Sequence, residues 1–307
     1  MLAFLLAVLL PALHWDQGPT TANAVKEAGV KRLYVPAGQV AAWKKLDFDA
    51  QAFDAAKFVK LPAPGVEYKM DEAAATSLPW VDANVWRFAR DGNRAYYYEV
   101  PWRKAALAAA EAFANGVDAA VHLDPRELAA FGKMQAFLRA VEIPPLPVMA
   151  NIAIVDDGSD QTGEVMNLMA RRNLLFRVVP APDPNCDLNV QIGTDEFSQD
   201  DAADPFAFAT LVRKKLTDEK RLVRLYGSDV VLARMYGDAT HVRVHLINYG
   251  GGKVDGLRVR VRGEYAQGRL AAFGIQNTAL ADYGVADGGT EFTIPSMIVY
   301  AVVDLKK

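Results

Sequence analysis

The hydrophobic pattern changes its period near Arg221, and this change limits the folds that the chain of 307 residues can adopt. Before Arg221, short apolar runs alternate with longer helical patterns, which is typical of α/β folds with a parallel sheet. After Arg221, polar and apolar residues alternate one by one, as in 241–247 and 257–262. That alternation predicts antiparallel strands with one buried face. The sequence therefore predicts an α/β part followed by an all-β part.

The first α/β domain is predicted over residues 14–147. Within it, the pattern predicts strands at 95–100 and 119–123 and helices at 103–115 and 127–141. The first of these helices is rich in alanine, the residue with the highest helix propensity. A strand–helix–strand–helix order predicts parallel strands joined by crossover helices.

A proline-rich joint at 143–147 predicts a domain boundary. After it, residues 148–155 form an apolar run that is typical of a buried parallel strand, and 205–216 reads as a helix. A small open α/β domain of the Rossmann or flavodoxin type is therefore predicted over 148–220. An antiparallel β-sandwich is predicted over 221–307.

Residues 1–13 are almost wholly apolar and contain no charged side chain. A membrane-spanning helix needs about 20 apolar residues, so no stable membrane span is expected here. The run has the length of a signal-peptide core, although a basic residue near its start is missing. We expect a cleaved signal peptide at 1–13 and an exported protein, periplasmic or extracellular. The alternative is that the run is a first buried strand.

Charge and cysteine content exclude some classes of protein. The formal net charge is −3, and no run of Lys or Arg is longer than three, so no nucleic-acid partner is expected. A single cysteine, Cys186, rules out a disulfide framework within the chain. No phosphate-binding glycine motif is present, and we expect no cofactor and no metal site.

The C-terminal strings carry a resemblance to a known family. The segment 245–249, paired with 292–295 and with the closing strand 300–305, resembles the C-terminal β-domain of several glycoside hydrolases, including the family 42 type of β-galactosidase. The domain order is also similar: a barrel-like domain, a flavodoxin-like domain of the trimerisation type, and a sandwich. In that family the middle domain resembles a glutamine amidotransferase fold without its catalytic apparatus.

This resemblance implies a secreted glycoside hydrolase-like protein that acts on or binds carbohydrate. It also implies a possible homo-oligomer through the middle domain. A complete eight-stranded barrel needs at least about 200 residues. The resemblance therefore implies an abbreviated TIM-barrel-like domain over 14–147.

Three carboxylates follow predicted strands and are candidates for catalysis. Glycoside hydrolysis uses two carboxyl groups, and in barrels such groups lie at the C-terminal ends of strands. Asp16, Glu99 and Asp124 occupy such positions. The structural alternative is that Asp16 and Asp124 are turn or helix-cap residues, and that Glu99 pairs with a nearby arginine.

Aromatic side chains near these carboxylates are candidates for sugar binding, because their flat faces can stack on sugar rings. The candidates for substrate binding are Trp15, Tyr97, Trp86, Trp102 and His122. Two hypotheses follow: a hydrolase that uses paired carboxylates, or a non-catalytic carbohydrate-binding or assembly protein with a degenerate barrel.

The predicted sandwich strands carry a basic row on one face. Val244 and its apolar neighbours point to the core, and the opposite face carries His241, Arg243, His245, Arg258, Arg260 and Arg262. His241 and His245 are separated by about 13 Å at strand rise, too far to share one metal ion. We expect this row to be a solvated face of a structural module that does not bind sugar.

Overall fold

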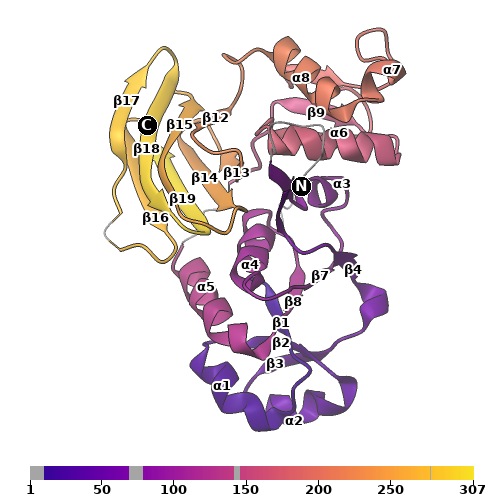
Figure 1. Cartoon of the computed structure of the whole chain (residues 1–307), viewed down its shortest axis with the longest axis vertical. Helices are drawn as coiled ribbons and strands as arrows, with labels where there is room; N and C mark the ends of the chain where they lie inside the picture. Colours follow the sequence, from indigo (N-terminus) through magenta and orange to yellow (C-terminus); the bar gives the residue numbers. More distant parts are fainter. Residues whose placement is uncertain (1–9, 69–78, 142–145, 277) are drawn as a thin grey trace. The chain divides into compact units, whose positions relative to one another are not determined.

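A computed structural model describes residues 10–68, 79–141, 146–276 and 278–307. The chain divides into two compact units, of which the first contains residues 1–65 and 91–145, and the second 66–90 and 146–307. Figure 1 labels the helices and strands. Each unit has its own sheets and is described separately.

The first unit is built on one parallel sheet of six short strands. In chain order they are β1 (Ala12–His14), β2 (Arg32–Val35), β3 (Asp49–Ala52), β4 (Val59–Leu61), β7 (Tyr96–Glu99) and β8 (Ala119–His122). Their order in the sheet is β3-β2-β1-β8-β7-β4, and every described pairing is parallel. All carboxyl ends therefore meet along one edge of the sheet.

The strand order is cyclic, as in a βα barrel, but the sheet stays open. Read across the sheet from the other edge, the order is β4, β7, β8, β1, β2, β3. In this order each of β4, β7, β1 and β2 lies beside the next strand of this sheet along the chain, and β8 lies beside β1, as neighbouring strands do in a βα barrel. However, β3 and β4 are the two edges, and only residues 53–58 join them, which leaves no room for a crossover helix of ordinary length. The barrel implied for 14–147 is therefore not confirmed, and the described strands form an open six-stranded sheet.

The described α-helices of this unit are α1 (Ala22–Glu27), α2 (Val40–Lys45), α4 (Ala105–Ala114) and α5 (Leu128–Ala140), and the 3-10 turn η4 (Pro125–Glu127) precedes α5. The helices α4 and α5 lie within the predicted ranges 103–115 and 127–141. The alanines of α4 are almost all buried, so this helix is packed on nearly every side. Its one buried acid, Glu111, accepts a hydrogen bond of 2.7 Å from the Tyr98 hydroxyl.

The predicted leader overlaps the sheet. Ala12 and Leu13 belong to β1, and Leu13 is completely buried between β2 and β8. For residues 12 and 13, the structure therefore agrees with the alternative interpretation of this run, a first buried strand. Residues 1–9 lie outside the described residues, so export and cleavage stay predictions. Part of the predicted proline-rich joint, 142–145, also lies outside them.

The second unit begins with an α/β part on a three-stranded parallel sheet. Its strands are β9 (Ile152–Val155), β10 (Phe176–Val179) and β11 (Leu188–Val190), in the order β10-β9-β11. That order matches the first three strands of the flavodoxin-like arrangement. The open parallel α/β fold predicted for 148–220 is confirmed at this level.

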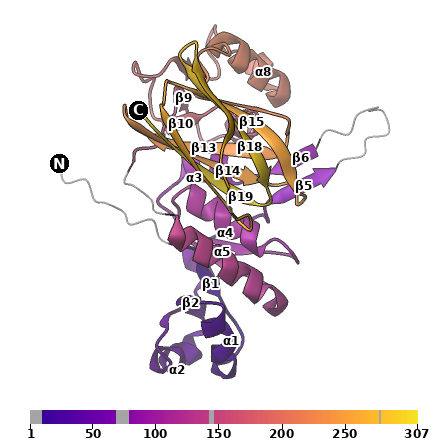
Figure 2. The same ribbon diagram turned by 90° about the vertical axis from the view of Figure 1, so that its left-hand side faces the viewer.

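Helices cover this small sheet. They are α3 (Val85–Arg90), α6 (Asp160–Arg171), α7 (Gln199–Ala202) and α8 (Pro205–Leu216), and Figure 2 shows α8 close to this sheet. A two-stranded sheet of β5 (Gly65–Tyr68) and β6 (Pro79–Asp82) precedes α3.

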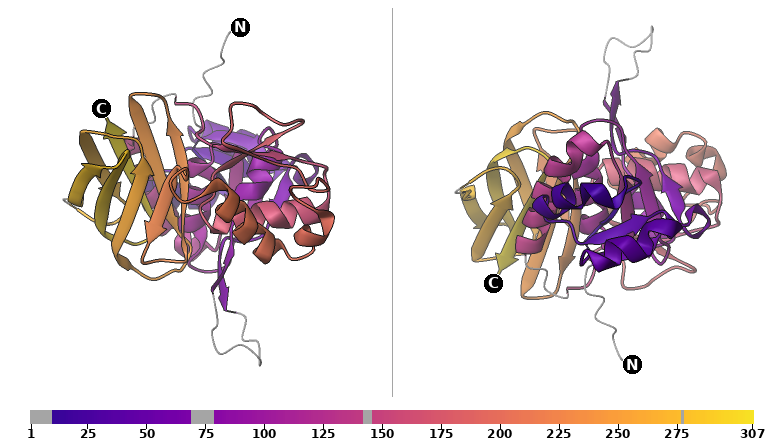
Figure 3. Two further views of the ribbon diagram at one scale, coloured as in Figure 1. Left: turned by 90° about the horizontal axis from the view of Figure 1, so that it is seen from above. Right: turned by 90° about the horizontal axis from the view of Figure 1, so that it is seen from below.

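The rest of the second unit is the predicted β-sandwich (Figure 3). One sheet has the order β12-β15-β18-β17 and the other β13-β14-β19-β16, and all their pairings are antiparallel. The strands are β12 (Val223–Tyr226), β13 (Val231–Gly237), β14 (His241–Asn248), β15 (Val254–Arg262), β16 (Gln267–Ala272), β17 (Ala281–Ala286), β18 (Gly289–Met297) and β19 (Tyr300–Lys306). Val244, Leu246 and Val259 are among the completely buried side chains of its core.

The predicted basic row does not form one face, because its histidines and Arg243 lie on β14 and its other arginines lie on β15 of the other sheet. It is also only partly solvated, and both findings correct the prediction. Arg243 is 5% exposed and His245 is 2% exposed. Arg243 donates two hydrogen bonds of 2.7 Å to Asp304, its direct neighbour on β19, and the His245 imidazole contacts the Tyr300 hydroxyl at 2.5 Å. Pairing with polar groups of the adjacent strand makes this burial possible. The alternation of polar and apolar residues identifies the face of a strand that points to the core. It does not show whether other parts of the protein cover the opposite face.

A search of the described residues for a helix long and apolar enough to cross a membrane finds none.

Candidate functional site

The parallel register brings polar strand ends together at the carboxyl edge of the first unit. His14 of β1 lies beside His122 of β8, and His122 lies beside Glu99 of β7. These three residues point to the same face of the sheet as Ala12, Ala120 and Tyr97, because side chains alternate along each strand. The small alanines are covered by the rings of Tyr34, Phe53, Phe58 and Tyr97, and the polar groups gather at the edge of the sheet.

A carboxylate–imidazole contact and an ion pair organise this edge. Asp16, two residues after β1, places its carboxylate Oδ2 3.4 Å from Nε2 of His122. Glu99 pairs with Lys60 of β4, the strand next to β7. Both carboxylates are about half exposed, so they can meet a ligand from solvent. We call Asp16, His14, His122, Glu99, Lys60 and Tyr97 the carboxyl-edge site.

Both carboxylates of the site are held in the charged form. The hydrogen bond and the charge of Lys60 lower the pKa of Glu99. Burial raises the pKa of Asp16, but hydrogen bonds from Gln17 and His122 and the charge of His122 outweigh it, and the pKa is lowered. At neutral pH each group is therefore a hydrogen-bond acceptor and not a proton donor.

His14 is a neutral member of the site. Burial, with the charge of His122, lowers its pKa to about 4, and the carboxylates of Asp16 and Glu99 oppose this shift. Its ring stacks on Phe53 with the centroids 3.7 Å apart and lies 4.8 Å from the ring of His122. Its Nδ1 atom is buried and has no hydrogen-bond partner among the described residues.

Aromatic rings continue from the site over the same face of the sheet. Phe53 follows β3, Phe58 precedes β4, and their rings stack with the centroids 5.1 Å apart. Tyr97 contacts Phe53 edge-on at 5.4 Å, and the Lys60 ammonium lies 5.9 Å from the Tyr97 ring. The site thus combines charged acceptors with partly buried aromatic surface, the combination that sugar binding uses.

Of the predicted catalytic carboxylates, Asp16 and Glu99 are brought together around His122, but Asp124 is engaged elsewhere. Asp124 caps the turn η4 by accepting a hydrogen bond from the Arg126 amide at 2.9 Å, and it also pairs with the Arg126 guanidinium. These bonds from Arg126 lower its pKa to about 2. The arrangement agrees with the structural alternative of a cap residue. Among the predicted binding residues, His122 and Tyr97 are part of the site.

The three predicted tryptophans have other contacts. Trp15 is 2% exposed and donates a hydrogen bond of 2.9 Å to the Thr21 hydroxyl. Trp102 is exposed, and the Arg126 guanidinium carbon lies over its ring, 4.5 Å from the ring centroid. Trp86 belongs to the second unit, where it packs against α6 so closely that a Cβ at Gly163 would lie 2.8 Å from its ring. None of these contacts places a tryptophan in the carboxyl-edge site.

His14, Lys60 and Phe53 were not predicted from the sequence. His14 is the last residue of β1, the strand that Asp16 follows. The rule that functional residues lie at strand ends could therefore have selected His14 as well. Lys60 lies in β4, whose three residues show no recognisable strand pattern. Among the described residues, no group of three or more His, Cys, Asp or Glu side chains is arranged to hold a metal ion.

The comparisons with known proteins give a fold but no family. No protein-family model matches the sequence, and no curated protein is similar to it in sequence. The structure is similar to α-L-fucosidase isoenzyme 2 from Paenibacillus thiaminolyticus, with a TM-score of 0.57, 9% identity, and coverage of 89% of this chain and 68% of the fucosidase. The chain therefore shares its fold with a glycoside hydrolase.

Two other glycoside hydrolases are less similar. A rhamnosidase from Novosphingobium sp. PP1Y has a TM-score of 0.48, 11% identity, and coverage of 94% of this chain and 38% of that protein. A β-galactosidase from Rahnella sp. R3 has a TM-score of 0.38, 10% identity, and coverage of 96% and 60%. The chain thus spans less than two thirds of these two proteins.

Proposed function

We propose that the protein binds carbohydrate at the carboxyl-edge site. The observation that carries this proposal is the convergence of Asp16 and Glu99 around His122, next to the aromatic surface of Tyr97 and Phe53. Charged carboxylates accept hydrogen bonds from sugar hydroxyl groups, and aromatic faces pack against their C–H groups. The shared fold with an α-L-fucosidase supports a sugar as the ligand.

Binding fits the electrostatics better than hydrolysis by two carboxyl groups. Hydrolysis needs a carboxylic acid whose pKa is raised, so that it can protonate the leaving group. In this site the pKa of Glu99 and the pKa of Asp16 are both lowered. Neither residue is therefore a proton donor near neutral pH.

Hydrolysis is the second candidate, and one contact favours it. The imidazole of His122 lies 3.4 Å from the Asp16 carboxylate, and an imidazole can act as a general acid or base. In this reaction His122 donates the proton to the leaving oxygen, and Glu99 attacks or stabilises the sugar on the other side. The family 42 resemblance belongs to this candidate.

Ligand binding and turnover can be tested together. We expect one of a panel of fucosides, rhamnosides and galactosides to bind the purified protein in isothermal titration calorimetry. Glu99→Gln and Asp16→Asn should each weaken that affinity at least about tenfold, the effect of losing a charge-assisted hydrogen bond. Asp124→Asn is the matched control and should leave the affinity unchanged, because its carboxylate is occupied by Arg126.

The outcomes separate the two candidates. Binding without release of the aglycone from aryl glycosides supports the binding protein. Turnover that is lost in His122→Gln, Glu99→Gln and Asp16→Asn supports the hydrolase. Absence of both binding and turnover, or equal affinity in all variants, contradicts a carbohydrate site at this edge.

We also propose export, with a cleavage site that leaves β1 intact. Removing Ala12 and Leu13 would delete most of a central strand, since both are buried between β2 and β8. If a leader is cleaved, the mature chain should therefore begin before Ala12. N-terminal sequencing of the protein from its host tests this, and a mature start at Trp15 contradicts it.

A further inference from the structure

A cavity of about 150 Å³ in the second unit is lined mainly by arginines. Its lining residues are Glu219, Arg221, Arg224, Arg260, Arg262, Asp287 and Gly288. The cavity is smaller than the roughly 300–1,000 Å³ that drug-sized ligands occupy. The volume of the cavity suits a small chemical group, and the guanidinium groups that line it favour a negatively charged one.

Like charges face one another at this cavity. Arg224 of β12 lies directly opposite Arg260 of β15 in the antiparallel register. Directly opposed like charges destabilise a sheet unless a counter-charge lies between them. Arg224 has no hydrogen bond or ion pair with any described residue, although its charge acts at longer range on the Glu219 carboxylate, which also lines the cavity. A bound anion would relieve this repulsion.

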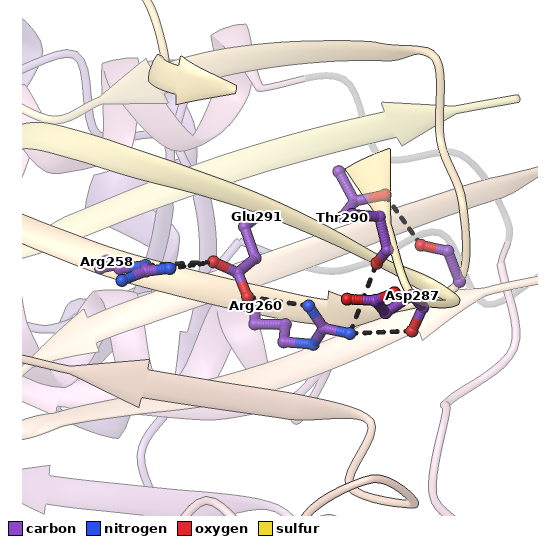
Figure 4. A network of polar contacts seen from close by, with 7 residues as sticks. Arg258, Arg260, Asp287, Thr290 and Glu291 are labelled. Atoms are coloured by element: carbon purple, nitrogen blue, oxygen red, sulfur yellow. Dashed lines mark hydrogen bonds and ion pairs between the residues drawn. The ribbon is translucent and has the colours of Figure 1, made fainter. Parts of the chain in front are cut away.

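The neighbouring carboxylates are shared and do not neutralise the cluster. Glu291 pairs with both Arg258 and Arg260, as Figure 4 shows. Asp218 likewise pairs with both Arg213 and Arg221. One carboxylate thus serves two guanidinium groups in each network, which leaves an excess of positive charge around the cavity.

The other arginines are held in place, so the cavity is preformed. Arg260 donates to Glu291 at 2.8 Å and to the Asp287 carbonyl at 2.9 Å (Figure 4). Gly289 makes room for it, because a Cβ there would lie 2.7 Å from the guanidinium carbon. Arg262 is fixed by Asp187 at 2.6 Å.

Arg221 contributes an unsatisfied donor. Its side chain is only 9% exposed, and its Nε atom is buried without a hydrogen-bond partner among the described residues. Buried donors are nearly always satisfied in native structures, by protein, water or a ligand. Arg221 therefore brings to the lining of the cavity a guanidinium group that its own contacts do not fully satisfy.

We propose that this arginine cavity binds a tetrahedral oxyanion, a sulfate or phosphate group, with Arg224 and Arg260 as its main ligands. Guanidinium groups match the oxygens of such groups in geometry and charge. The site lies in the second unit and does not depend on the carbohydrate proposal for the first unit. The oxyanion can be free in solution or carried by a larger molecule such as a sulfated sugar.

The test is a titration of the full chain with sodium sulfate and sodium phosphate at constant ionic strength, with chloride as the reference salt. We expect saturable heat in calorimetry and a rise in Tm that levels off as the site fills. Arg224→Gln should weaken the affinity at least about tenfold, by the loss of a charge-assisted hydrogen bond. Circular dichroism checks that the variant is folded.

The matched control is Arg258→Gln, which removes the same charge from the same sheet. Arg258 does not line the cavity, and its side chain is 62% exposed. We expect its affinity to stay within about twofold of wild type. Equal losses in Arg224→Gln and Arg258→Gln would show only a general charge effect and overturn the proposal, as would the absence of saturable binding.

A third arm distinguishes the sources of the oxyanion. Galactose 6-sulfate is compared with inorganic sulfate and with neutral galactose. Tighter binding of galactose 6-sulfate that depends on Arg224 indicates an oxyanion carried by a sugar, and equal affinity indicates a free oxyanion. Both results support the site.

Discussion

The carboxyl-edge site of the first unit and the two sheets of the sandwich all carry charged residues, but different physical causes assemble them. At the carboxyl edge, parallel pairing brings the ends of neighbouring strands together, so residues such as Glu99 and His122 meet although they are distant in sequence. On the sandwich, antiparallel pairing places Arg243 beside Asp304 and Arg224 beside Arg260.

The difference teaches where charge can serve a ligand. Glu99 and Asp16 are about half exposed, so solvent and ligands reach them. Arg243 and His245 are buried and pair with Asp304 and Tyr300 of the adjacent strand, although the Arg243 Nη1 atom has no hydrogen-bond partner among the described residues. Arg224 differs from both, because it lines a cavity and has no partner among the described residues. Exposure and partners, more than charge itself, separate these roles.

The largest effect is expected for Val244→Asp in the sandwich core. Val244 is completely buried, and the variant would place a carboxylate without a partner among apolar side chains. We expect a loss of more than about 4 kcal/mol, enough to unfold the sandwich. Val285→Asp, at an exposed valine of the edge strand β17, should leave the Tm almost unchanged. Thermal unfolding followed by circular dichroism measures both, and similar Tm values would contradict the assigned core.

Asp304→Asn should have the next largest effect. It leaves Arg243 buried with a weaker partner, and breaking a buried ion pair typically costs about 3–5 kcal/mol. Since Asp304 is 22% exposed, we expect a loss of about 2–3 kcal/mol in urea denaturation. Asp255→Asn is the control, because the Lys253–Asp255 pair is more than half exposed and should contribute little. Equal effects of the two substitutions would show that the buried pair has no special role.

Buried neutral histidines should make stability depend on pH. Burial, with the charge of Arg243, lowers the pKa of His245 to about 3, although Asp304 opposes this. Between pH 6.5 and 3 the unfolded state therefore binds a proton that the folded state does not bind, and stability falls as pH falls. From pH 6.5 to 5 the loss should be about 2 kcal/mol for this group.

His14 contributes in the same direction in the first unit, since its pKa is lowered to about 4. Urea denaturation of the sandwich at pH 6.5 and pH 5 measures the effect of His245. In His245→Asn the difference between the two pH values should nearly vanish, while the stability at pH 6.5 decreases. An unchanged difference in this variant would mean that other groups carry the dependence.

Sequence periodicity predicted the regular parts of the fold. The helix at Pro205–Leu216 and the strand beginning at His241 follow directly from helical and alternating patterns. Short strands such as Asp49–Ala52 and Val59–Leu61 were missed, because three or four mostly polar or edge residues cannot show a period. These strands form the two open edges of the sheet, so the barrel is not confirmed at the place where periodicity gave no signal.

The candidate site was predicted in part, for a similar reason. The rule that functional residues follow strand ends selected Asp16, Glu99 and His122, which the parallel register brings together. The same rule also selected Asp124, since a cap residue and a catalytic residue occupy the same kind of position. Lys60 was missed because its strand was missed. Only the hydrogen bonds of the folded chain distinguish these cases.

The smallest effect is expected for Asp124→Ala, which tests this distinction directly. The variant removes the cap of η4 and the contact with Arg126, both on the surface. We expect the Tm to fall by about 1–2 °C, as for other exposed caps in a chain of this size. Sugar affinity and any turnover should equal those of wild type, whereas Glu99→Gln should reduce them with little change in Tm. A loss of affinity in Asp124→Ala, with folding intact, would extend the carboxyl-edge site to the loop after β8 and restore Asp124 as a candidate for catalysis.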